Sequence, residues 1–177
     1  MSRQEFVTVL YRIMNPVVQP KADPDAKSFN DVAPDRWSYD AIEWSYENGI
    51  IRPDDGGAFH PEGLITRAEM AVMLVNAGLL TDIAENTFSD IENHPYRDDI
   101  LKAVFAGVYE GYPDGTIKPD NNATRYEVIT AVVRFMLRGE PTGDMWAGLE
   151  TPYTDVPRSH WAYKYVALAT FGCTVPL

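Results

Sequence analysis

Ser2-Arg3-Gln4-Glu5, Thr66-Arg67-Ala68-Glu69 and Thr124-Arg125-Tyr126-Glu127 are three copies of one tetrapeptide, Ser/Thr-Arg-x-Glu. The copies lie about 64 and 58 residues apart, and each opens an apolar run with helical spacing. A separation this regular is typical of repeated supersecondary units, none of which can bury its apolar face alone. The pattern therefore favours an assembly of repeats over a catalytic pocket.

The tetrapeptide has the chemistry of a capping box. The hydroxyl of the first residue accepts from the amide of the glutamate, whose carboxylate accepts in return from the first amide. This predicts helix starts at Ser2, Thr66 and Thr124, each contributing about 1 kcal/mol. Apolar residues recur at helical spacing behind each start, and we expect them to form the core of a helical bundle. They are Phe6, Val9, Leu10 and Ile13; Met70, Met73, Leu74 and Ala77; and Val128, Ala131, Val132 and Phe135.

A second signal recurs as Phe29-Asn30-Asp31-Val32, Phe88-Ser89-Asp90-Ile91 and Tyr153-Thr154-Asp155-Val156. We call these three tetrapeptides the anchoring segments, because the aromatic and the aliphatic residue can insert into a core while the aspartate bonds nearby amides. A predicted helix follows each, over about residues 37–48, 97–106 and 161–171. These helices end at Gly49, Gly107 and Gly172, where left-handed caps are expected.

Turn-rich loops at 52–57 and 111–116 connect each first helix to the next Ser/Thr-Arg-x-Glu helix. One repeat is thus an anchoring segment, a first helix, a loop and a second helix. Complete repeats are predicted at 28–80 and 87–138, a C-terminal half repeat at 1–15 and an N-terminal half repeat at 152–177. We expect an all-α, pseudo-threefold bundle of helix-loop-helix repeats forming one compact domain, in which the two terminal halves combine into a third unit.

The capping box does not explain the arginines at positions 3, 67 and 125. They lie in the first helical turn, where the positive end of the helix dipole disfavours a cation. Each therefore needs a negative partner. One candidate is a protein carboxylate such as Asp31, Asp90 or Asp155, in a buried brace between repeats. The other is an anionic ligand held by the guanidinium together with the helix amides, and both can hold at one site.

The composition excludes several functions. A formal net charge of −11 argues against nucleic acid and against an anionic membrane surface. No apolar stretch approaches the roughly 18 residues of a membrane span, and no signal peptide is visible. The single cysteine, Cys173, excludes an internal disulfide framework and a cysteine-based zinc site.

No cofactor or metal is expected. The three histidines do not form a zinc motif, and no nucleophile elbow, phosphate loop or dinucleotide fingerprint occurs. The acidic turn at 114–122 lacks the regular spacing of a calcium loop, which favours solvated turns. Trp37 and Trp161, at the starts of their first helices, suit sugar stacking and the covering of a core end equally well.

The order of these motifs resembles the S-layer homology repeat of bacterial surface proteins. The similarity covers Phe29 to Val32, Trp37 to Ile42, Gly49 to Ile51 and Ile65 to Glu69, with the Gly111 to Thr116 turn intact in the second repeat. The resemblance implies a non-catalytic, extracellular module of the cell wall or S-layer. It implies an anionic, often pyruvylated, secondary cell-wall polysaccharide as ligand in grooves between repeats, with other surface-layer proteins as further partners.

The resemblance also implies which residues line the grooves, and Gly111 would let the backbone approach the sugar. Tyr126 stands at a position where the family has a small residue, and Ser2-Arg3-Gln4-Glu5 lacks the usual Thr and Ala. We therefore expect fewer than three working grooves, the best of them at Arg67. The ligand-binding candidates are Arg3, Arg67, Arg125, Glu5, Glu69, Glu127, Asp31, Asp90, Asp155, Trp37, Trp161 and Gly111.

Two other functions compete with glycan anchoring. The repeats could form a structural spacer or protein-docking module of a surface assembly, with the arginines bracing the fold. An enzyme acting on wall glycans would need two carboxylates facing one cleft, and the sequence locates no such pair.

Overall fold

The regular structure of this protein is helical, which confirms the all-α prediction. The computed structural model describes residues 1–14, 21–23, 25 and 27–171, so Gly172 and Cys173 lie outside the described residues. Two isolated bridges, Ser2 with Leu64 and Thr66 with Asn122, join helix starts to loops. The helices are α1 (Arg3–Met14), α2 (Tyr39–Glu47), α3 (Arg67–Gly78), α4 (Arg97–Phe105), α5 (Arg125–Leu137), α6 (Gly143–Trp146) and α7 (Tyr163–Phe171).

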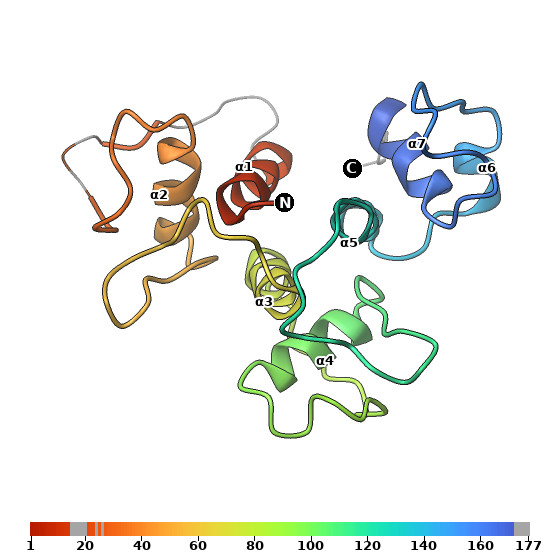
Figure 1. The fold of residues 1–177 in the computed structure, drawn as a ribbon, viewed down its shortest axis with the longest axis horizontal. Helices are drawn as coiled ribbons and strands as arrows, with labels where there is room; N and C mark the ends of the chain where they lie inside the picture. The colour runs from red at the N-terminus through yellow and green to blue at the C-terminus, as the bar shows by residue number, and fades with distance from the viewer. Residues whose placement is uncertain (15–20, 24, 26, 172–177) are drawn as a thin grey trace.

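The long helices α1, α3 and α5 lie towards the middle, and α2, α4 and α7 lie around them (Figure 1). The closest packing joins α1 to α2, α3 to α4 and α5 to α7. Each first helix therefore packs on the second helix of the preceding repeat. A pseudo-threefold relation between the three pairs, and the repeat boundaries given above, stay predictions.

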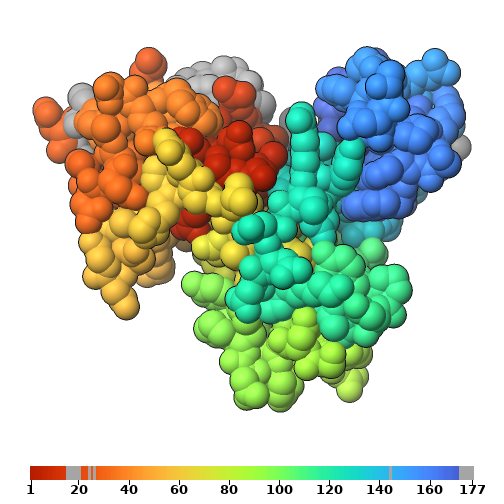
Figure 2. Space-filling model, in the orientation of Figure 1, coloured from red at the N-terminus to blue at the C-terminus, as the bar shows by residue number. Residues whose placement is uncertain are grey.

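Whether the terminal half repeats combine into a third unit stays a prediction. Among the described helices, α1 packs mainly on α2 and α7 on α5. Figure 2 shows the surface hollowed between the N-terminal and the C-terminal residues. Each half repeat buries its apolar face against a complete repeat, so neither needs the other for that purpose.

The helix ends follow the local chemistry of the sequence. Thr66 and Thr124 form complete capping boxes, and Ser2 makes both of the same hydrogen bonds with Glu5. Gly49 and Gly107 cap α2 and α4 with φ of 70° and 68°, as predicted. The helices α2 and α7 begin two residues later than expected, because Trp37 and Trp161 lie in the turns that precede them.

The core is built from the faces of the second helices and from inserted loop residues. Phe6, Leu10, Met70 and Leu74 are fully buried. A smaller cluster contains Val133, Val156 and Val166 between α5 and α7. Trp146 of the short helix α6 packs on this cluster, with its ring centre 6.3 Å from that of Tyr163.

Two loop residues, Phe59 and Ile117, are held by the anchoring segment of their own repeat. Asp31 accepts from the amides of Phe59 (2.8 Å) and His60 (2.7 Å). Asp90 accepts in the same way from Ile117 (2.9 Å) and Lys118 (2.7 Å). Burial works against the charge of Asp31, but these amide bonds outweigh it and hold its pKa below the ordinary value.

The inserted loop residues should contribute strongly to stability. The Phe59 ring is fully buried, 5.4 Å from that of Phe29, whereas Phe105 of α4 is 59% exposed. Phe59→Ala should lower the free energy of unfolding by about 3–5 kcal/mol. Phe105→Ala should change it by less than about 0.5 kcal/mol. Urea unfolding of the two variants checks this, and equal losses would contradict the insertion of Phe59.

Candidate functional site

The arginine of the second tetrapeptide, Arg67, is a buried brace between repeats. Its side chain is 5% exposed, and Nη1 donates to Oε1 of Glu127 at 2.5 Å. Nε donates to the carbonyl of Ile117 (2.7 Å), and Nη2 to that of Glu110 (3.2 Å). The guanidinium also lies 4.8 Å from the ring centre of Tyr109 and 4.6 Å from that of Tyr112. Three of its five N–H groups are therefore engaged inside the protein.

Arg3 repeats this arrangement one unit earlier. Its Nε donates to the carbonyl of Phe59 at 2.8 Å, and its Nη1 forms an ion pair with Glu69. The partner of each brace is thus the glutamate of the next tetrapeptide. The expected brace to a protein carboxylate is thus present at Arg3 and Arg67, but the carboxylate is this glutamate and not an anchoring aspartate, because Asp31 and Asp90 accept from loop amides.

Each of these glutamates can cap its own helix and also pair with an arginine, because a carboxylate has two oxygens. Glu127 accepts from the amide of Thr124 with Oε2 (2.8 Å) and from Arg67 with Oε1. Burial raises the pKa of Glu127, but the Tyr112 hydroxyl, the capping bonds of Thr124 and the charge of Arg67 together lower it below the ordinary value. One side chain therefore caps its own helix and closes the brace.

Arg125 is the exception in this series. It is exposed, and it makes no hydrogen bond or ion pair with any residue that the structure describes. The glutamate that would continue the pattern is Glu5, whose pKa is lowered first by the Ser2 amide and also, more weakly, by the charge of Arg125. Both side chains line a cavity of about 460 Å³ with Trp37 and Arg12.

The helix amides next to Arg67 and Arg3 already have partners. Arg67 N donates to Asn121 O (2.9 Å) and Ala68 N to Pro119 O (2.9 Å). The Arg3 and Gln4 amides bond Gly63 O and Pro61 O in the same way. An anion cannot be held there by guanidinium and helix amides together, which corrects one of our two hypotheses for these arginines.

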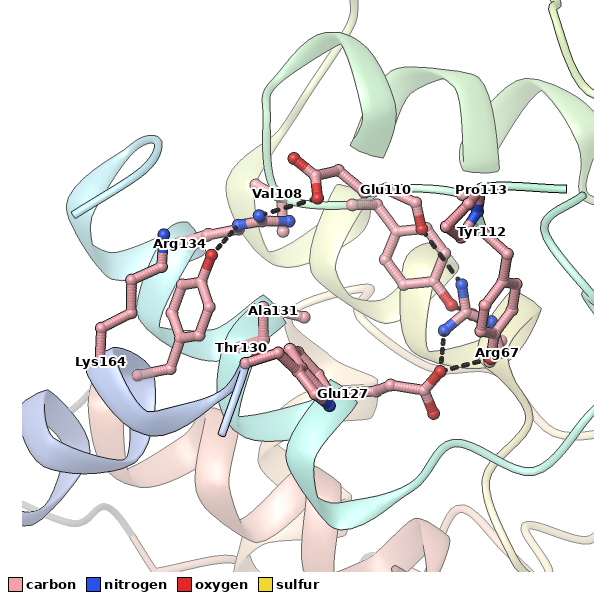
Figure 3. Close-up of a pocket in the computed structure, with 14 residues that line it drawn as sticks. Arg67, Val108, Glu110, Tyr112, Pro113, Glu127, Thr130, Ala131, Arg134 and Lys164 are labelled. Carbon is pink, nitrogen blue, oxygen red and sulfur yellow. Dashed lines mark hydrogen bonds and ion pairs between the residues drawn. The ribbon is translucent and has the colours of Figure 1, made fainter. Parts of the chain in front are cut away.

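A groove lies between the start of α3, the loop segment 108–113, and the helices α5 and α7. It has a volume of about 580 Å³, and we call it the main groove. Figure 3 shows Arg67 and Glu127 at one end and Arg134 and Lys164 at the other, with Thr130 and Ala131 of α5 between them. Trp161, which is 57% exposed, contributes to its lining.

The end of the main groove near α7 contains residues that sequence reasoning missed. Buried Arg134 donates to Glu110 (2.9 Å) and pairs with Glu140, which also accepts from Lys164 (2.8 Å) and Tyr165 (2.7 Å). Burial opposes the charge of Glu140, but the bonds from Lys164 and Tyr165 and the charge of Arg134 lower its pKa. The sequence offered one indication that Arg134 has a special role, namely that it is a basic residue inside the apolar run 128–137.

The structure brings only some of the predicted site residues together. Arg67, Glu127, Gly111 and Trp161 line the main groove, while Arg3 and Glu69 form a separate brace. Glu5, Trp37 and Arg125 line the second cavity. Asp31 and Asp90 accept hydrogen bonds from the amides of loop residues, whereas Asp155 accepts from the Tyr126 hydroxyl at 3.0 Å.

Gly111 has a structural role that we did not expect. A Cβ at this position would lie 2.3 Å from the Phe88 ring and 2.9 Å from the Thr116 carbonyl. The absent side chain is therefore required first by packing within the protein. Its backbone also lines the main groove.

The main groove combines an exposed indole, a lysine amine and braced guanidinium groups. Three cationic side chains line it together with the carboxylates Glu110 and Glu127, and a third carboxylate, Glu140, pairs with Arg134 and Lys164. Aromatic faces stack on apolar sugar faces, and cations bind acidic substituents. The arrangement can hold an acidic carbohydrate. Within the described residues, no helix is long and apolar enough to cross a membrane.

Comparison with known proteins finds one family and several curated relatives. The profile of the S-layer homology domain matches residues 28–71 and 87–129. A cellulosome-anchoring protein of Acetivibrio thermocellus is 30% identical over 173 residues, which are 94% of this chain and 37% of that protein. The S-layer protein sap of Bacillus anthracis is 32% identical, covering 66% of this chain and 14% of its own length.

An endoglucanase of a Bacillus species is 29% identical over 133 residues, which are 73% of this chain and 14% of the enzyme. The chain thus spans about a third of the cellulosome-anchoring protein and a smaller part of the other two.

The buried brace and the exposed arginine give a matched pair of variants at the same motif position. Arg67→Ala leaves Glu127 without its cation and should cost about 3–5 kcal/mol of unfolding free energy. Arg125→Ala removes an exposed side chain and should cost less than about 0.5 kcal/mol. Urea denaturation measures both, and similar costs would disprove the asymmetry.

The brace should also make stability depend on pH. The folded pKa of Glu127 lies below its unfolded value, so its contribution is complete above the unfolded pKa and is lost as pH falls through the folded pKa. Glu127→Gln should therefore be less stable than the wild type at pH 7, with the gap closing in acid. Denaturation midpoints between pH 7 and about pH 2.5 measure this. A gap that is constant with pH would contradict it, and the exposed Glu150→Gln is the control.

Proposed function

Because this chain belongs to the S-layer homology family, we propose that it is a non-catalytic module that attaches to an anionic cell-wall polysaccharide. The main groove is the proposed binding site. The observation that carries the proposal is the exposed Trp161 beside Lys164 in a groove lined by three cationic side chains, on a protein of net charge −11. Such local cations are what an acidic glycan needs against an unfavourable overall field.

The residues of the main groove would have different roles. Trp161 offers its face to a sugar ring, and the Lys164 amine, with its side chain 31% exposed, reaches an acidic substituent such as a pyruvyl ketal. Three N–H groups of Arg67 are bonded within the protein, so its side chain is fixed as part of the groove wall. The other two N–H groups are left for a ligand. Gly111 and Tyr112 line the groove beside Arg67, with the Tyr112 ring centre 4.6 Å from its guanidinium.

The relatives support a surface location. One is named a cellulosome-anchoring protein and another an S-layer protein, and this chain matches each over only part of its length. We infer that this chain acts outside the cell, at the wall or the S-layer, and that surface-layer proteins are further partners.

The match to an endoglucanase does not argue for catalysis, because it covers 14% of that enzyme. Glycoside hydrolysis needs one carboxyl group that is protonated and one that is free. In the main groove Glu110 is paired with Arg134 and Glu127 with Arg67, and the pKa of Glu127 is lowered. Glu127 is therefore not poised to donate a proton.

A structural or protein-docking spacer is the second candidate. The braces at Arg3 and Arg67 favour it, because both motif arginines are used within the fold. Under this alternative the main groove would bind no glycan, and substitutions of its exposed residues would not affect function.

Retention on pyruvylated wall polysaccharide separates the two candidates. Trp161→Ala and Lys164→Ala should each weaken retention about tenfold, which corresponds to roughly 1.4 kcal/mol. The matched controls Phe105→Ala and Lys102→Ala, on α4, should behave as the wild type. Acid removal of the ketals should abolish the effect of Lys164. If both groove variants are retained as well as the wild type, or if the wild type is not retained at all, glycan binding is rejected and the spacer function remains.

A further inference from the structure

Three donors converge on one carboxylate at the α7 end of the main groove. Nζ of Lys164 donates to Glu140 at 2.8 Å, and the Tyr165 hydroxyl donates to it at 2.7 Å. Arg134 forms an ion pair with the same carboxylate, and its Nε donates to the Tyr165 oxygen at 3.1 Å (Figure 3). We call Arg134, Lys164 and Tyr165 the donor triad. All three line the main groove, and Glu140 reaches them from the segment that follows α5.

The donor triad is held in place by the fold and not by Glu140 alone. The Arg134 side chain, on α5, is 6% exposed and also donates to Glu110 at 2.9 Å. The Tyr165 ring, on α7, is buried in the cluster between these two helices. The Arg134 guanidinium and the Lys164 amine lie 5.2 Å and 4.9 Å from the centre of this ring. The donors therefore stay in place when the carboxylate leaves.

Glu140, in contrast, lies at the exposed edge of this arrangement. Its side chain is 45% exposed. All of its hydrogen bonds and ion pairs with described residues are to the donor triad. Exposed side chains change rotamer within nanoseconds, so rotation of this one side chain releases the carboxylate into water without moving a helix.

The donors around Glu140 match any carboxylate and not this one alone. Charge-assisted hydrogen bonds from a guanidinium and an ammonium group are the strong bonds that select carboxylates. The bond to Glu140 raises the pKa of Lys164 above its ordinary value, so the amine is charged. The carboxylate of an acidic sugar has the same charge and the same two oxygens as that of Glu140. The two groups would therefore compete for the donor triad.

We propose that the donor triad is the carboxylate subsite of the main groove, and that Glu140 occupies this subsite until the carboxylate of an acidic sugar displaces it. This inference rests on the proposed glycan function and adds to it a binding residue, Tyr165, and an internal competitor, Glu140. Only the fraction of molecules in which Glu140 has left the triad is ready to bind, so the apparent affinity is lowered by that fraction. A purely structural Glu140 would have the opposite effect, because its loss would loosen α7 and weaken binding.

The first test measures the affinity of whole-chain variants for pyruvylated wall polysaccharide. Glu140→Ala should bind at least about fivefold more tightly than the wild type, because the donors are then vacant. Adding Tyr165→Phe, which keeps the buried ring, should weaken binding about tenfold relative to Glu140→Ala alone, because one hydrogen bond to a charged group is lost. Glu150→Ala, at an exposed glutamate further along the same segment, should bind as the wild type does.

Three controls separate displacement from other effects. On carboxyl-reduced polysaccharide, Glu140→Ala and the wild type should bind equally. Glu110→Ala, which removes another negative charge from the groove, should raise affinity less than Glu140→Ala does. Glu140→Gln, which keeps an acceptor for Lys164 and Tyr165, should give a smaller gain than alanine, and thermal unfolding checks that each variant is folded.

A second measurement does not depend on the polysaccharide. Free pyruvate should shift the NMR resonances of Lys164 and Tyr165 saturably in Glu140→Ala, in the millimolar range, and more weakly in the wild type. If neither protein is retained on the polysaccharide, the proposed anchoring fails, and the pyruvate shifts alone decide the carboxylate subsite.

Three results would overturn the inference. The first is the absence of saturable pyruvate shifts in Glu140→Ala. The second, where the wild type is retained, is a folded Glu140→Ala variant that binds the polysaccharide no more tightly. The third is an equal gain from Glu110→Ala, which would assign the effect to general repulsion between the groove and an anionic ligand.

Discussion

The constraint on which this structure depends is the forward brace from the motif arginines Arg3 and Arg67 to the next repeat. Arg67 joins the start of α3 to the carbonyl of Ile117 and to the glutamate that opens α5. A cation is tolerated at this helix start because the first amides of α3 already donate to loop carbonyls. The groups left around the guanidinium are therefore hydrogen-bond acceptors. The brace thus fixes loop, helix start and helix-to-helix geometry together. The wall of the main groove is a consequence of it.

Much of the fold could be predicted from local chemistry. The capping boxes at Thr66 and Thr124 and the glycine caps at 49 and 107 depend on residues close in sequence, and these predictions are confirmed. The partner of Arg67 could not be predicted in this way, because the capping role of Glu127 uses one carboxylate oxygen and gives no sign of what the second one binds. Only the packing of successive repeats brings that oxygen to Arg67.

The candidate site was less predictable than the fold. Trp161, Gly111 and Arg67 were named from motif positions, and they do line one groove. Lys164 and Arg134 carry no motif, and they meet across Glu140 only because α7 packs on α5. The position of Trp161 follows from its place in a turn before the helix, where an indole stays exposed instead of covering the core.

The braces all point from a helix to the repeat that comes later in the chain, and this gives the array a direction. A newly duplicated repeat would bring its own inserted residue and glutamate to the arginine of the repeat before it, as the second repeat does at Arg67. Copy number can therefore change while the residues of the earlier repeats stay the same. Variation in the number of such modules is compatible with a fold in which every junction is made by the same few atoms.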